Sequence, residues 1–269
     1  MSAIKSHNRR YFIAIGAFMA AAAGVYGLAR FYPALGPIAG TVTPQLYVDS
    51  LPGIQIPARG RSVLVDAASA RLYMLEDGRV RDSMKVIVGK PETPTPSLKS
   101  VIHYETLNPY WHVTEDLART LIAPRVLQDG KEYLTTRGYE VVSAFGPNAQ
   151  VLSPESVDWK AVADGKTQVL VRQRPGPANS LGQVKFDLPD GDGIYLHDTP
   201  KKELFAQDAR NLSHGCVRLE DAQRLARWML GKEPPVASNP EEHILLPRPV
   251  PITISYLDSR AQMQLALLQ

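Results

Sequence analysis

The sequence has one cysteine, no internal repeat and little net charge beyond its first thirty residues. A single cysteine, Cys216, excludes an internal disulfide and a Cys-x-x-Cys metal site. Residues 1–30 contain four Lys or Arg and no Asp or Glu, whereas the whole chain has 30 basic and 27 acidic residues, so the remainder is nearly neutral. A near-neutral domain lacks the basic surface that nucleic-acid binding requires. Any catalytic chemistry must therefore be sought around the one thiol or among residues that need no thiol.

Long apolar runs are also scarce, and the one present is at the N-terminus. Lys5, Arg9 and Arg10 precede a charge-free run from Tyr11 to Ala29. Such a run is either a signal peptide or an uncleaved anchor of about twenty residues, the length that spans a bilayer. We predict a transmembrane anchor over residues 1–30, because the run is longer than a usual signal core. The basic flank orients the rest of the chain to the extracytoplasmic side, the periplasm in a two-membrane cell.

The composition after the apolar run predicts a tether, then one domain. Residues 31–60 are rich in Pro and Gly, which is typical of a semi-extended linker. Residues 61–257 are enough for a single domain with a substantial core, and we interpret residues 258–269 as a C-terminal tail. Residues 114–173 mix short helical and extended patterns and do not predict a clear sheet.

The remaining patterns predict a mainly β domain with few helices, a β-rich α+β fold. Asp77-Gly78 is a two-residue hairpin signal between two strands. A helix is expected over 220–230, because apolar residues recur at helical spacing before Gly231. The expected strands are Ser62–Ala67, Arg71–Glu76, Val80–Val88, Ser100–Thr106, Val184–Leu188, Ile194–His197 and Ile252–Tyr256.

The residues around Cys216 favour a nucleophile. A thiol attacks a carbonyl as its thiolate, so it needs a nearby base or a positive field. His214 lies two residues before it, and His197 ends a predicted strand, a rigid platform for a base. Gly215 permits a turn that exposes consecutive N–H groups, so His214, Gly215 and Cys216 are candidates for an oxyanion hole. Arg218, two residues on, is a candidate ligand for a substrate carboxylate.

Each of these residues also has a structural interpretation. Cys216 alone would more often be a small buried apolar residue, and His197 a hydrogen-bonded strand-end histidine. His214 could only hold the turn, and Arg218 could only pair with Glu220 or Asp221 at the surface. A zinc site from His197, His214 and Cys216 is disfavoured because there is no second cysteine.

The spacing of these residues resembles a known family. His197, fifteen residues, then Ser213-His214-Gly215-Cys216-Val217-Arg218 is similar to the signature of the L,D-transpeptidases with a YkuD-like catalytic domain. Arg218 and the segment Tyr195–Pro200 resemble the YcbB-like branch, as do the segments 86–91, 107–113 and 175–182. The resemblance implies a YkuD-like β-sandwich with an active-site helix and a capping subdomain inserted over about 114–173.

The resemblance also implies an activity. Cys216 would attack a peptidoglycan tetrapeptide donor stem, release D-alanine and pass the acyl group to an acceptor stem, forming a 3→3 crosslink; a lipoprotein or a D-amino acid could replace that acceptor. His197 would relay protons, held by a neighbouring carbonyl such as that of Asp198. Arg218, Tyr195, Ser213 and Trp111 would bind substrate, although a core position suits Trp111 equally well. No metal or cofactor is implied, and carbapenems would be inhibitors.

Two other functions stay open at this point. A Cys-dependent L,D-carboxypeptidase or endopeptidase would use the same residues with water as acceptor. A non-catalytic wall-binding module would need neither Cys216 nor His197. With only the linker 31–60 between the apolar run and the first strand, we expect affinity for the polymer to come from the catalytic domain, the capping subdomain or a partner.

Overall fold

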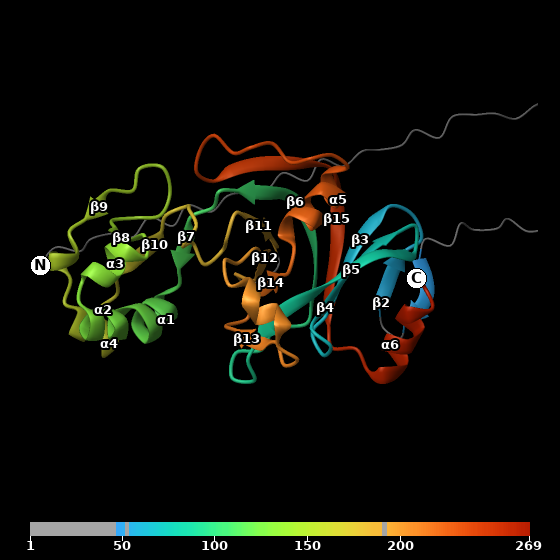
Figure 1. The fold of residues 1–269 in the computed structure, drawn as a ribbon, viewed down its shortest axis with the longest axis horizontal. Coiled ribbons are helices and arrows are strands. Elements are labelled where there is room, and N and C mark those ends of the chain that lie inside the picture. Colours follow the sequence, from blue (N-terminus) through green and yellow to red (C-terminus); the bar gives the residue numbers. More distant parts are fainter. Residues whose placement is uncertain (1–46, 52–53, 190–192) are drawn as a thin grey trace, which may run out of the picture. The chain divides into compact units, whose positions relative to one another are not determined.

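The structure, a computed structural model, describes residues 47–51, 54–189 and 193–269 (Figure 1). The predicted membrane anchor and most of the predicted linker lie outside these residues. Within the described ranges, no helix is both long enough and apolar enough to cross a membrane.

The described residues are mainly β, as the sequence predicts, and their largest element is a nine-stranded sheet. Its strand order is β13-β5-β14-β12-β11-β6-β15-β3-β4, and β4 pairs back onto β5. The sheet therefore closes on itself, because β4 pairs with both β3 and β5. The strands are β3 (Arg61–Asp66), β4 (Arg71–Glu76), β5 (Arg79–Gly89), β6 (Leu98–Leu107), β11 (Val184–Asp187), β12 (Tyr195–His197), β13 (Asn211–Ser213), β14 (Val217–Leu219) and β15 (Glu242–Ser255).

Closure depends on the length of β5. Its first part pairs with β4, Val86 and Ile87 pair with β14, and its last two residues pair with β13. The predicted hairpin between β4 and β5 is confirmed: Asp77 and Gly78 both have positive φ, 53° and 74°, as a type I′ turn requires. One long strand thus joins the N-terminal hairpin to β13 and β14, the strands on either side of the single cysteine.

Residues 111–181 form a compact region with its own small sheet and its own core, which we call the capping region. Its sheet has the order β7-β10-β8-β9, and its buried cluster runs from Trp111 to Leu181. Thr114 caps the first helix by accepting a hydrogen bond from the Leu117 N–H. The elements, green to yellow in Figure 1, are β7 (Trp111–Val113), α1 (Glu115–Leu117), η1 (Ala118–Ile122), α2 (Ala123–Asp129), α3 (Glu132–Thr136), β8 (Tyr139–Val142), β9 (Val151–Leu152), η2 (Pro154–Ser156), α4 (Trp159–Ala163) and β10 (Leu170–Gln173).

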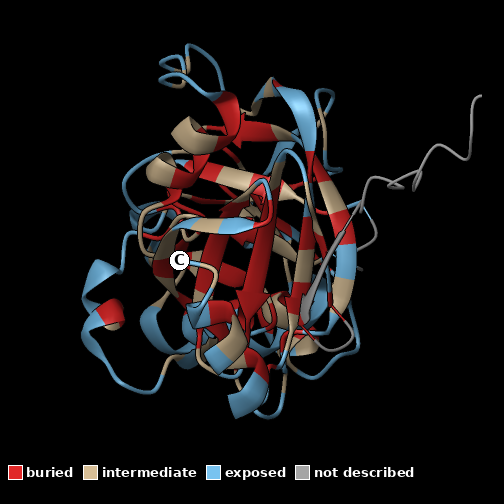
Figure 2. Ribbon diagram, turned by 90° about the vertical axis from the view of Figure 1, so that its right-hand side faces the viewer, coloured by how far each residue is buried: buried red, intermediate tan, exposed pale blue. Residues whose placement is uncertain are grey.

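The main core lies between the large sheet and α5 (Ala222–Leu230). Apolar residues recur at helical spacing in α5, and Ala222, Leu225, Ala226 and Met229 are all buried against sheet residues. Asp221 begins this helix by accepting from the Arg224 N–H, so the helix predicted over 220–230 is confirmed to within two residues. Figure 2 shows the buried strands as a continuous red interior, with exposed segments confined to its periphery.

Both ends of the domain contain more structure than the sequence predicts. β1 (Tyr47–Leu51) and β2 (Ile54–Pro57) form an antiparallel pair within the predicted linker, and α6 (Ser259–Ala266) replaces the predicted tail. The reason is burial, because Leu51, Ile56 and Leu265 share one apolar cluster on the outer side of the β3–β4 hairpin. The high Pro and Gly content led to the prediction of an unstructured linker, although a few apolar residues within it are buried and stabilise the strand pair.

The last strand is also longer than predicted. β15 begins at Glu242 and passes through a proline-rich stretch that the sequence analysis left without structure. Its register with β6 shifts between Leu245 and Val250, where Pro247 and Pro249 lie. A bulge tolerates proline because the missing N–H is not needed for pairing there.

Candidate active site

Two short parallel strands bring the predicted residues together. β12 and β14 pair with Leu196 opposite Val217 and His197 opposite Arg218. Side chains alternate along a strand, and paired residues of neighbouring strands project from the same face. His197 and Arg218 therefore share one face of the sheet, and Cys216, just before β14, lies beside Tyr195. The pairing of β12 with β14 thus brings His197 and Cys216, nineteen positions apart in sequence, onto neighbouring parts of the sheet.

His197 is a buried, neutral imidazole. It is 4% exposed, and its Nδ1 lies 2.5 Å from the Asp198 carbonyl oxygen. Because a carbonyl can only accept, Nδ1 carries the proton and Nε2 is left with a lone pair. Burial, and then the positive charge of Arg218, lower its pKa to about 3. The ring is therefore poised to accept a proton, as the sequence analysis expected of a base.

The Cys216 thiol is partly exposed and protonated at rest. Its Sγ donates to the Gly193 carbonyl oxygen at 3.7 Å. Burial raises its pKa, while the neighbouring Tyr195 and the charge of Arg218 act in the opposite direction. Among the hydrogen bonds of the described residues, none joins Cys216 to His197. The free site is thus a neutral thiol and a neutral imidazole rather than an ion pair.

The Ser213–Cys216 turn is held by its own serine. Gly215 has φ +119°, a conformation that other residues rarely adopt. Its N–H donates to Ser213 Oγ at 3.1 Å, and Ser213 Oγ donates to the Cys216 carbonyl oxygen at 2.6 Å. The Gly215 N–H is therefore engaged, contrary to its predicted place in an oxyanion hole. His214 and Cys216 remain the candidate donors, and Ser213, 1% exposed, holds the turn rather than facing substrate.

Besides Ser213, the turn is held by Thr95, a residue that was not predicted from the sequence. The buried Thr95 hydroxyl donates to the Gly215 carbonyl oxygen at 2.6 Å and accepts from the Gly89 N–H at 2.9 Å. Thr95 lies in the loop between β5 and β6, and its own carbonyl accepts from the Tyr256 hydroxyl at 2.8 Å. The only local sequence signal for this role is that Thr95 is flanked by two prolines. Its hydrogen-bond partner, Gly215, is 120 residues away in sequence.

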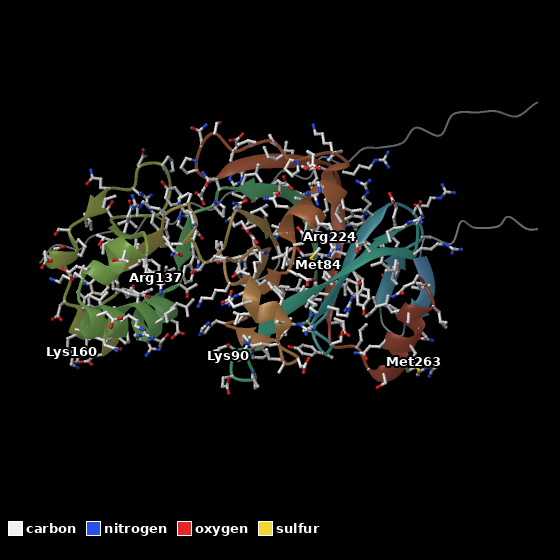
Figure 3. All side chains as sticks on the ribbon, viewed as in Figure 1. Met84, Lys90, Arg137, Lys160, Arg224 and Met263 are labelled. Carbon is white, nitrogen blue, oxygen red and sulfur yellow. The ribbon has the colours of Figure 1, made fainter. Side chains whose placement is uncertain are left out.

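His214 and Arg218 form the polar rim of the site. His214 is exposed, and its Nε2 lies 3.4 Å from Lys90 Nζ; Lys90, labelled in Figure 3, follows the end of β5. Partial burial, and then Lys90 and Arg218, lower the pKa of His214, while Asp116 of the capping region acts in the opposite direction. No salt bridge of the described residues involves Arg218, so the expected alternative of pairing with Glu220 or Asp221 does not occur.

Tyr195 connects the thiol to the capping region. Its half-buried ring packs against the buried cluster of that region, and it lies opposite Cys216 at the start of the β12–β14 pair. Burial is the largest cause that raises the pKa of this phenol. Trp111 itself is 8% exposed, so it occupies the core position that the sequence analysis gave as the alternative to substrate binding.

Asp198 contributes its backbone rather than its side chain. Its carbonyl oxygen accepts from His197, whereas its carboxylate pairs with Lys202 at 2.7 Å and accepts from the Gln183 N–H at 3.0 Å. The side chain thus fixes the strand end that positions the imidazole. In the part of the chain that the structure describes, no group of three or more His, Cys, Asp or Glu residues could hold a metal ion.

This arrangement defines a class: a β-rich domain with a cysteine and a neutral histidine on adjacent strands. The family model described as YkuD, the L,D-transpeptidase catalytic domain, matches residues 60–252, so the chain belongs to this family. A Haemophilus influenzae protein that carries the L,D-transpeptidase name is 35% identical over 175 residues, or 65% of this chain. The chain spans about a third (35%) of the length of that relative.

The comparison with solved structures returns several L,D-transpeptidases, all at TM-scores below 0.5. An L,D-transpeptidase from Mycobacterium smegmatis is 15% identical, with 76% of this chain and 63% of that chain covered and a TM-score of 0.37. The catalytic domain from the Enterococcus faecium L,D-transpeptidase is 13% identical, with 73% and 98% covered and a TM-score of 0.36. The L,D-transpeptidase 3 of Mycobacterium tuberculosis, solved with a faropenem-derived adduct, is 14% identical, with 72% and 60% covered and a TM-score of 0.35.

Proposed function

We propose that this protein forms 3→3 crosslinks in peptidoglycan, through a thioester on Cys216. The observation that carries the proposal is the His197 imidazole, which is buried and neutral and is held by its Nδ1–H on the strand that pairs with β14. The free lone pair on Nε2 lies on the same sheet face as the thiol, and this placement suits proton transfer between them. A histidine with only a structural role would not require it. A wall-binding module would need neither group, so this geometry favours an enzyme.

The first half of the reaction cleaves a donor stem. Nε2 of His197 takes the Cys216 proton as Sγ attacks the carbonyl of the L-centre of the diamino acid at position three. The negative charge on the carbonyl oxygen is stabilised by the N–H groups of His214 and Cys216. The imidazolium returns its proton to the departing nitrogen, so D-alanine leaves as an amine and a thioester remains. Arg218, which pairs with no carboxylate among the described residues, binds a stem carboxylate.

The second half forms the crosslink. The side-chain amine of an acceptor stem attacks the thioester carbonyl, His197 removes a proton from that nitrogen, and the thiol is restored. Bond energy is conserved as one amide is exchanged for another through the thioester, so no nucleotide is consumed. A reaction that consumes no nucleotide can proceed outside the cytoplasm, where ATP is absent. We infer this location from the apolar run before residue 30.

The test is the mass of the intact protein after incubation with tetrapeptide stems. We expect a thioester adduct and released D-alanine with the native chain, and no adduct with Cys216→Ala. His197→Ala should acylate about 10²–10⁴-fold more slowly, the range typical of a lost general base. A cooperative thermal transition in both variants would show that the fold is intact. Near-native turnover by His197→Ala would refute the assignment of the base.

The products identify the acceptor. Dimers joined through two position-three residues indicate a transpeptidase, whereas free tripeptides alone would indicate a carboxypeptidase that uses water. Carbapenem should acylate Cys216 in either case, so an adduct with carbapenem distinguishes an enzyme from a wall-binding module but does not distinguish these two enzymes. Lipoprotein or a D-amino acid can be supplied as an alternative amine in the same assay.

A further inference from the structure

A row of polar side chains crosses the sheet from the active site. The register places His197 opposite Lys185 on β11, Lys185 opposite Thr106 on β6, and Thr106 opposite His243 on β15. Tyr195 lies opposite Asp187 in the adjacent row. Paired residues share a face of the sheet, so all of these side chains lie on the face that bears the catalytic groups.

Lys185 and Asp187 form a fixed pair of opposite charges on this face. Lys185 Nζ donates to Asp187 Oδ1 at 3.1 Å, and the Thr106 hydroxyl donates to Asp187 Oδ2 at 3.2 Å. His243 Nδ1 lies 3.0 Å from the same hydroxyl. The side chains of Lys185 and Asp187 are 15% and 26% exposed, so both are constrained yet reachable from solvent. An ordinary surface ion pair is more exposed and is not supported by a buried hydroxyl.

The pair lies within reach of a substrate bound at the thiol. Strands of a sheet are about 4.8 Å apart, so β11 lies two spacings, roughly 10 Å, from β14. Tyr195 occupies the interval: Lys185 Nζ lies 5.7 Å from the centre of its ring. Burial, and with it the charge of Asp187, raises the pKa of the Tyr195 phenol, which is consistent with the position of Tyr195 between the thiol and Asp187. An apolar segment can therefore cross the Tyr195 ring between the two sites.

We propose that Lys185 and Asp187 bind a zwitterionic carbon, one that carries both an ammonium and a carboxylate, at the side-chain end of the donor residue attacked by Cys216. The inference rests on the proposed function, because it requires a diamino acid at position three of the donor. Lys185 pairs with the ligand carboxylate and Asp187 with the ligand ammonium, so four charges alternate around a square. The methylene chain of the donor residue lies over Tyr195.

The proposal predicts discrimination between two donor tetrapeptides. One carries meso-diaminopimelate at position three, and the other carries L-lysine, which has the ammonium but lacks the side-chain carboxylate. The native protein should form the thioester with the first peptide about tenfold to a hundredfold faster, as expected for one hydrogen-bonded charge pair. Lys185→Met should abolish this preference by slowing only the first peptide. Asp187→Asn should slow both peptides by a similar factor, because both carry the ammonium.

The controls separate this inference from the proposed function. Lys99→Met changes an exposed lysine on β6, at the end remote from Thr106, and should keep the native preference. Alkylation of Cys216 by iodoacetamide should be equally fast in all variants if the thiol is undisturbed. Equal rates for both peptides on the native protein, or a preference that survives Lys185→Met, would overturn the inference alone. If neither peptide acylates a thiol that still alkylates, the proposed function fails, and this inference fails with it.

Discussion

At the scale of single residues, the position of the nucleophile depends on side chains that never touch substrate. The Thr95 hydroxyl is hydrogen-bonded to both the Gly89 N–H and the Gly215 carbonyl oxygen. The Ser213 hydroxyl accepts from the Gly215 N–H and donates to the Cys216 carbonyl oxygen. Glycine can adopt many backbone conformations, and these bonds hold Gly215 at φ +119°. The reactivity of Cys216 is thus a property of the loop as well as of the histidine.

Replacement of Thr95 by valine should destabilise the domain by about 1–3 kcal/mol. The substitution preserves volume but leaves a buried N–H and a buried carbonyl without their partner. Chemical denaturation of the purified domain measures the change, and Thr95→Ser should retain most of the stability because it keeps the hydroxyl. Thr93→Val is the matched control: its hydroxyl lies 3.5 Å from the Ser213 carbonyl oxygen and is not fully buried, so a loss below about 1 kcal/mol is expected. Equal losses in the two valine variants would contradict this account.

The neutral thiol predicts a pH profile. Burial raises the pKa of Cys216, and His197, with a pKa of about 3, does not titrate near neutral pH. The rate of alkylation by iodoacetamide should therefore rise about tenfold per pH unit from pH 6 upward and level off above the pH expected of an ordinary thiol. Because Cys216 is the one cysteine of the chain, the loss of free thiol reports this site alone. A plateau already reached at pH 6 would indicate a thiolate–imidazolium pair instead.

At the scale of elements, strands with local signals were predictable and those with distant partners were not. The β4–β5 hairpin was predicted because Asp77 and Gly78 determine its turn locally. The sequence also placed His197 at a strand end. The pairing of β12 with β14 was not predictable, because parallel strands are joined by a long connection and not by a short turn with a recognisable sequence. Thr95 was missed for the same reason, since its partner is remote in sequence.

Helix α6 illustrates how burial outweighs composition. Leu265 is fully buried beside Tyr73 and Leu75, while Leu267 at the helix end is 83% exposed. Leu265→Ala should therefore lower the free energy of unfolding by about 2–5 kcal/mol, the usual cost of a core cavity. Leu267→Ala should change it by less than about 0.5 kcal/mol. Denaturant titration of both variants measures the difference, and similar stabilities would show that α6 is not part of the folded domain.

At the scale of the whole domain, two apolar clusters are linked at the active site. The main cluster fills the closed sheet, and the second fills the capping region, where Tyr195 packs from β12. The catalytic strand thus contacts both cores, with Leu196 in the first and Tyr195 against the second. The sequence predicted a capping subdomain only by resemblance, because its short elements lack a strong period.

The main sheet also carries a buried charge that should make the stability of the entire domain depend on pH. Glu105 is 0% exposed, and neither carboxylate oxygen has a hydrogen-bond partner within the described residues. Burial raises its pKa to about 7, so the folded state retains a proton that the unfolded chain releases near pH 4.5. The stabilisation is complete below pH 4.5 and is lost as pH rises toward 7.

Glu105→Gln should remove this dependence, because an amide of the same shape does not ionise. Urea denaturation at pH 5, 6, 7 and 8 should show that the native protein loses stability relative to the variant between pH 5 and 7, by at most about 1.4 kcal/mol per pH unit. The difference should level off as the pH passes 7 and reaches 8, since the carboxyl then becomes ionised in both states. Glu203→Gln, at an exposed site in η3 (Lys202–Ala206), should follow the native curve. A native protein whose stability parallels that of Glu105→Gln at every pH would show that Glu105 is solvated or paired in solution.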